Sequence, residues 1–160
     1  MKRIAVVAAI MLLSVSAFAQ NGRSIYKKYS EADDVSAVYI SPSMFRLMGK
    51  IPSVELDGDN VDFTSIVKSL TGFYLIDSDN AAINSKIRDE VDRFVKSGNY
   101  EMLMEVKDKG ETVHFYTVGK GDTITSFVML AYETGSCTFI CMDGSMQKGK
   151  LEDIIAKAGK

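Results

Sequence analysis

The last third of the chain limits the fold most, because its pattern changes there to a period of two and four segments are predicted to be strands. They are Tyr100 to Lys107, Thr112 to Val118, Thr123 to Tyr132 and Ser136 to Met142. Each gap between them is short and contains glycine. Strands joined by such short loops pair as antiparallel hairpins, so the sequence predicts a C-terminal four-stranded meander.

The earlier part of the chain mixes helices with strands. The most regular helix is predicted over Ala81–Ser97, where Ile83, Ile87, Val91, Phe94 and Val95 form one apolar stripe. Further helices are expected over residues 22–29, 43–48, 61–70 and 151–158, and strands over residues 35–41 and 73–76. The segment of residues 51–60 is expected to be a loop.

Helices that interrupt the early strands, followed by an antiparallel meander, are typical of the α+β class. We expect one α+β domain over residues 20–160, a two-layer sandwich whose mostly antiparallel sheet packs its helices on one face. The run Phe127 to Ala131 is apolar at every position, which predicts a central strand that is covered on both faces.

The first nineteen residues have the pattern of a secretory signal peptide. Lys2 and Arg3 precede an apolar stretch from Ile4 to Leu13, and Ala17-Phe18-Ala19 supplies the small residues that a signal peptidase accepts. We expect cleavage after Ala19 and export to the periplasm or cell envelope; an uncleaved N-terminal anchor is the alternative. No later apolar run approaches the roughly 20 residues of a membrane span, so none is expected after cleavage.

Charge and composition exclude two classes of protein. The 19 Lys and Arg residues against 21 Asp and Glu leave a net charge of −2, which does not favour a nucleic-acid-binding surface. The 46% hydrophobic and 25% charged residues are ordinary globular values and exclude a disordered chain. One histidine and two cysteines offer few metal ligands, so we expect neither a metal nor a cofactor.

Cys137 and Cys141 lie on the same predicted strand. Residues four apart on a strand share a face but are about 13 Å apart. A disulfide requires Cα atoms within about 7 Å, so an internal bridge would break the strand. We expect two buried free thiols that pack as small apolar residues. Intramolecular or intermolecular disulfides and a reactive site are the alternatives.

His114 is the residue best suited to acid–base chemistry, because imidazole titrates near neutral pH. On its predicted strand it shares a face with Tyr116, so this pair is the catalytic candidate. No serine elbow, cysteine–histidine signature or pair of glutamates accompanies it in the sequence. A histidine on the sheet surface is the favoured interpretation. A catalytic His114 would require a pocket and a carboxylate within hydrogen-bonding distance.

Two Asp-x-Asp-Asn segments carry the candidate metal ligands, Asp57 and Asp59 in the first and Asp77 and Asp79 in the second. A calcium-binding loop needs a further ligand at its fifth position, where these segments place Val61 and Ala81. Because each segment precedes a predicted helix, capping of that helix by Asp and Asn is favoured over calcium binding.

Met102 and Met104 alternate with glutamates along the predicted strand 100–107. Methionine adapts its shape to varied apolar neighbours, so it serves both in cores and on promiscuous binding surfaces. Filling of the core is the favoured interpretation, and a groove for an apolar partner or ligand is the alternative.

Several of these segments together resemble one family. The stretch Val35-Ser36-Ala37-Val38-Tyr39-Ile40-Ser41-Pro42-Ser43-Met44-Phe45, with Leu47-Met48-Gly49, resembles the opening of a family of small exported bacterial proteins of Bacteroidetes type and uncharacterised function. Phe127 to Leu130, Phe139 to Gly144 and Leu151 to Ile154 are similar to its close. The resemblance implies a periplasmic or envelope location and supplies no catalytic residues.

These observations favour a non-enzymatic exported module that binds an unknown protein or a small apolar ligand in envelope sensing or homeostasis. A small hydrolase or isomerase that uses His114 is one alternative. A structural module that forms a homodimer through an exposed apolar face is the other.

Overall fold

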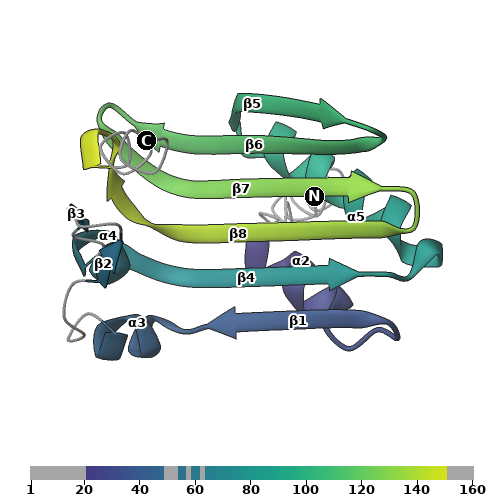
Figure 1. Cartoon of the computed structure of the whole chain (residues 1–160), viewed down its shortest axis with the longest axis horizontal. Helices are drawn as coiled ribbons and strands as arrows, with labels where there is room; N and C mark the ends of the chain where they lie inside the picture. Colours follow the sequence, from purple (N-terminus) through teal and green to yellow (C-terminus); the bar gives the residue numbers. More distant parts are fainter. Residues whose placement is uncertain (1–20, 49–53, 57–58, 62–63, 151–160) are drawn as a thin grey trace, which may run out of the picture.

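A six-stranded antiparallel sheet with the order β1-β4-β8-β7-β6-β5 dominates the structure (Figure 1). The structure is a computed structural model that describes residues 21–48, 54–56, 59–61 and 64–150. The strands are β1 (Val35–Ile40), β4 (Leu70–Ser78), β5 (Glu101–Asp108), β6 (Glu111–Lys120), β7 (Thr123–Glu133) and β8 (Ser136–Gln147). Two short strands, β2 (Val54–Leu56) and β3 (Asp59–Val61), form a separate hairpin.

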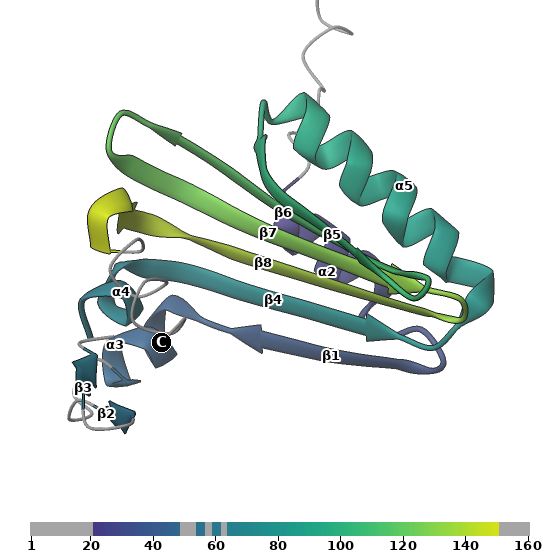
Figure 2. The same cartoon turned by 45° about the horizontal axis from the view of Figure 1, so that its top comes forward.

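The helices lie on both sides of this sheet (Figure 2). The longest, α5 (Ala81–Ser97), and α2 (Gly22–Tyr29) pack against one face. The short helices α3 (Pro42–Met48) and α4 (Thr64–Ser69) lie against one end of the opposite face. The α+β class is therefore confirmed, whereas the expected placement of helices on one face describes only α2 and α5.

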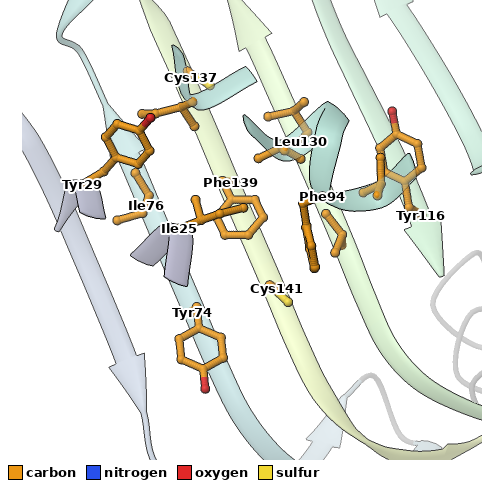
Figure 3. Packing of buried hydrophobic residues seen from close by; sticks show 14 residues of the cluster. Ile25, Tyr29, Tyr74, Ile76, Phe94, Tyr116, Leu130, Cys137, Phe139 and Cys141 are labelled. Atoms are coloured by element: carbon orange, nitrogen blue, oxygen red, sulfur yellow. The ribbon is translucent and has the colours of Figure 1, made fainter. Parts of the chain in front are cut away.

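The main core fills the face under α2 and α5 (Figure 3). Ile25 of α2, Ile87 of α5 and Phe139 of β8 are completely buried there. Each such side chain contributes about 1.5–3 kcal/mol by leaving water. The Asn80 side chain accepts a 3.0 Å hydrogen bond from the Ala82 N–H and so caps α5, as predicted for the second Asp-x-Asp-Asn segment.

A smaller cluster joins α3 and α4 to the other face. Its buried members are Phe45, Leu70, Ile124 and Met146. Leu70 was expected to end a helix over residues 61–70, but it begins β4 and pairs with Gly144 of β8. Its apolar side chain is buried by the sheet, which explains why the helical spacing was misleading. The predicted loop of residues 51–60 contains β2 and the start of β3.

Some predictions concern residues outside those that the structure describes. They are the signal peptide of residues 1–19 with its alternative of an anchor, and the helix of residues 151–158. The assignment of residues 20–160 to one domain stays a prediction. Within the described ranges, no helix combines the length and apolarity needed to cross a membrane.

Candidate functional site: the open face of the sheet

The two faces of the sheet differ in how well their apolar side chains are covered. Along β7 and β8, Val128 and Phe139 point toward α5 and are fully buried, whereas their neighbours Met129 and Ile140 are only half-buried. We call the second surface the open face. Its apolar side chains are Val38, Leu75, Met104, Val106, Val113, Phe115, Met129, Ala131 and Ile140.

The open face arises because the strands are apolar at successive positions. Alternation normally places polar residues on a solvent-facing surface, but β7 places Met129 and Ala131 there. Val38, Met104 and Val106 at the sides of this face are 44%, 49% and 42% exposed. Among the described residues, the expectation that Phe127 to Ala131 is covered on both faces therefore holds in part for Phe127, which packs against the cluster of Phe45 and Leu70, and is wrong for Met129 and Ala131.

Four carboxylates border one end of the open face. Each lies two positions before or after an open-face residue on its strand and so points to the same side. The four are Asp77, Asp108, Glu111 and Glu133. We call them the acidic rim. All four residues are exposed. Asp77 also accepts a 2.7 Å hydrogen bond from the Thr138 hydroxyl.

Helices α3 and α4 stand at the opposite end and carry exposed cations. Arg46 belongs to α3 and Lys68 to α4. We call this pair the basic pair. Helix α3 also presents Met44 and Leu47, which are 49% and 63% exposed. This end of the open face therefore continues onto an apolar helix surface that has basic neighbours.

A hollow of about 290 Å³ lies at the same end, near the β5 edge. Leu103, Thr117 and Ile124 line it, together with the charged residues Glu101 and Lys148. The hollow does not include His114, so it does not supply the pocket that a catalytic His114 requires.

His114 lies on the helix face, between two hydrogen-bonding partners. Its Nε2 is 2.8 Å from Glu105 Oε2, and its Nδ1 is 3.0 Å from the Tyr116 hydroxyl. Lys107 forms an ion pair of 2.9 Å with the same carboxylate of Glu105. The sequence analysis named His114 and Tyr116 but missed Glu105. The predicted hairpin contained the signal, because its register places Glu105 directly opposite His114.

The chemistry of this group of residues is weak for nucleophilic catalysis. Burial raises the pKa of Tyr116 to about 12, so its hydroxyl remains protonated at neutral pH. The Tyr116 side chain is also 6% exposed, which limits access for a substrate. The hydrogen bonds do connect β5 to β6 on the helix face, where the imidazole edge also contacts Tyr132.

The candidate metal ligands do not come together in the described residues. Asp57 lies outside those residues, and the structure describes only the backbone of Asp59, in β3. Asp77 bonds to Thr138, and the Asp79 N–H donates to the Asp34 carbonyl. Within the described ranges, no three His, Cys, Asp or Glu residues form a group suited to a metal ion.

Cys137 and Cys141 are free and buried on the helix face of β8, as predicted. Burial raises the pKa of the Cys137 thiol to about 11 and also raises the pKa of Cys141. Since the thiolate is the reactive form, both groups behave as small apolar residues.

Comparison with known families matches residues 28–154 to a domain of unknown function, DUF4252. The match covers most of the chain, so the chain belongs to this family. No significant match was found among curated proteins or among solved structures.

Proposed function

We propose that this member of the DUF4252 family is a non-enzymatic binding module of the cell envelope and that it binds its partner on the open face. The observation that carries the proposal is the incomplete burial of Met129, Phe115 and Ile140, which lie on interior strands of the sheet. Covering apolar surface gains roughly 25 cal/mol per Å², so this face favours an apolar partner.

The electrostatics of two nucleophilic side chains count against their use in covalent catalysis. The pKa values of Tyr116 and Cys137 are raised to about 12 and about 11 by burial. Nucleophiles used in catalysis require the opposite shift or an adjacent base within reach of substrate. The signal-peptide pattern of the first nineteen residues supports export.

The test compares two variants of one strand. Met104 is on the open face and Met102 on the helix side of β5, and they are 49% and 48% exposed. Met104→Asp and Met102→Asp therefore introduce the same charge at equal exposure on opposite faces. The proposal expects that the wild-type chain and Met102→Asp retain the same molecules from envelope extract, and that Met104→Asp loses them.

Two results would contradict the proposal. One is equal retention by all three proteins, which would place binding elsewhere. The other is turnover of a substrate in a panel of esters, glycosides and peptides, because the module is proposed to lack activity.

A small hydrolase or isomerase that uses His114 remains the second candidate, favoured by the chain of hydrogen bonds from Glu105 through His114 to Tyr116. A carboxylate that orients an imidazole is the arrangement that general-base catalysis uses. For this candidate, any activity found in the substrate panel must disappear in His114→Ala. Activity that survives the substitution eliminates it.

A further inference from the structure

We infer that the partner of the open face is a second copy of this chain, packed sheet against sheet so that the strands of the two copies run in opposite directions. The inference rests on the proposed function, since it names the partner of the same surface. In such a twofold dimer each copy contributes the same surface. Face-to-face sheets of this kind are about 10 Å apart and interdigitate their side chains.

The size of the open face is close to what a stable dimer needs. Six strands spaced about 4.8 Å apart span roughly 24 Å, and the stretch from Phe127 to Glu133 adds a length of about 20 Å. With the face treated as flat, the two copies together would therefore bury on the order of 1,000 Å² of surface. Protruding side chains add to this area. Specific interfaces bury about 1,200–2,000 Å². The exposed Met44 and Leu47 of α3 extend the apolar surface toward that range.

The distribution of charge selects the orientation. The acidic rim and the basic pair stand at opposite ends of the open face. When one copy is turned end over end, the Asp77 side of its rim meets Arg46 and Lys68 of the other copy, twice per dimer. Packing without that turn places four carboxylates against four carboxylates, which is repulsive. At the β5 side of the basic end, Glu101 and Lys148 line the same hollow and the Lys148 N–H donates to the Asp122 carbonyl, so this corner carries charges of both signs.

The shape of the molecule agrees with the same orientation. Helices α3 and α4 project from one end of the open face, whereas no described helix projects from the end at the acidic rim (Figure 2). Two copies turned end over end bring each projection to the end of the partner that has none. The exposed side chains of α3 then lie next to the partner's rim.

The first experiment measures self-association of the full chain, expressed with its own N-terminal segment, by light scattering and sedimentation. We expect a dimer at roughly 10 µM, the range of a moderate apolar interface. Met104→Asp should weaken dimerisation at least about tenfold, because it buries an unpaired charge, whereas Met102→Asp should not. Circular dichroism of both variants checks that they fold.

The second experiment tests orientation by exchanging charges. One variant reverses the rim (Asp77→Lys with Glu133→Lys) and the other reverses the basic pair (Arg46→Glu with Lys68→Glu). Each alone should dimerise more weakly than the wild-type chain. Their equimolar mixture should recover the wild-type association, because the heterodimer pairs opposite charges at both ends.

Three results would overturn the inference. The first is a wild-type chain that stays monomeric. If Met104→Asp in that case still loses molecules from envelope extract, the proposed function stands with a different partner. If a chain truncated after Lys150 dimerises and the full chain does not, residues 151–160 occupy the face instead. A mixture that fails to recover association contradicts the orientation.

Discussion

The two faces of the sheet contain the same kinds of apolar residue, but the side chains of one face are buried more completely than those of the other. On the helix face, α2 and α5 bury the apolar side chains of the central strands, although Met102 on the edge strand β5 stays 48% exposed, and buried polar groups have partners, such as the Ser78 hydroxyl that donates to Asn84. On the open face, equally apolar residues are only half-buried. The comparison teaches that apolar composition decides which surfaces can bury apolar area. The chain topology decides which of these surfaces is covered by helices within the monomer.

The strongest test of this comparison uses two adjacent residues of β8. Phe139→Ala removes a fully buried ring and should lower the free energy of unfolding by about 3–5 kcal/mol. Ile140→Ala, on the open face, should cost less than about 1.5 kcal/mol in the dilute monomer, because its side chain is already partly in water. Urea unfolding followed by circular dichroism measures both.

Protein concentration has to be controlled in this pair. A dimer through the open face would bury Ile140, and the cost of Ile140→Ala would then grow with concentration. If both variants lost the same free energy of unfolding in the dilute monomer, the two faces would be equally buried. The comparison between them would then have no basis.

A second, smaller effect concerns polar contacts on the two faces. The Tyr29 hydroxyl donates a 2.8 Å hydrogen bond to Glu90 within the buried helix face. Tyr29→Phe should therefore cost about 1 kcal/mol. The Thr138 hydroxyl makes a comparably short bond to Asp77 on the open face, but both groups have access to water. Thr138→Val should change the free energy of unfolding by less than about 0.5 kcal/mol.

The two hydrogen bonds differ little in length, so burial is the main difference that this pair tests, beside the ion pair of Lys28 with Glu90. Thermal or urea unfolding of both variants at the same protein concentration gives the comparison. A larger loss for Thr138→Val than for Tyr29→Phe would indicate that the open face excludes water.

The sequence was sufficient for the elements whose signal is local. The bounds of α2 and α5 were predicted as observed, because each has apolar residues at helical spacing and, in α5, Asn80 and Gly98 mark the two ends. The hairpins from β5 to β8 also followed from short glycine-containing turns, such as the one with Gly121 at φ 61°.

The strand order and the open face depended on information that no single segment contains. The pairing of β4 with both β1 and β8 is long-range, and neither register could be read from the sequence. Without it, the all-apolar run Phe127 to Ala131 predicted cover on both faces, although α5 covers only one. Glu105 was missed for the opposite reason: the information was local, in the register of a hairpin already predicted.

The smallest expected effect concerns the helix side of β5 and its response to acid. Hydrogen bonds from Lys107, and secondly from His114, lower the pKa of Glu105 below its ordinary value of 4.5. The ionised carboxylate is therefore the stabilised form in the folded chain. This stabilisation is present above pH 4.5 and is lost as the pH falls through the lower pKa of the folded state.

Glu105→Gln should thus be less stable than the wild-type chain at neutral pH, and the two melting temperatures should converge below pH 4.5. The difference should be small because the side chain of Glu105 is 40% exposed. Glu101→Gln, on the opposite face of β5, is the matched control. If the difference in melting temperature between Glu105→Gln and the wild-type chain persists unchanged into acid, the contact of Glu105 with His114 does not depend on charge. Packing alone would then hold the edge strand β5 on the helix face.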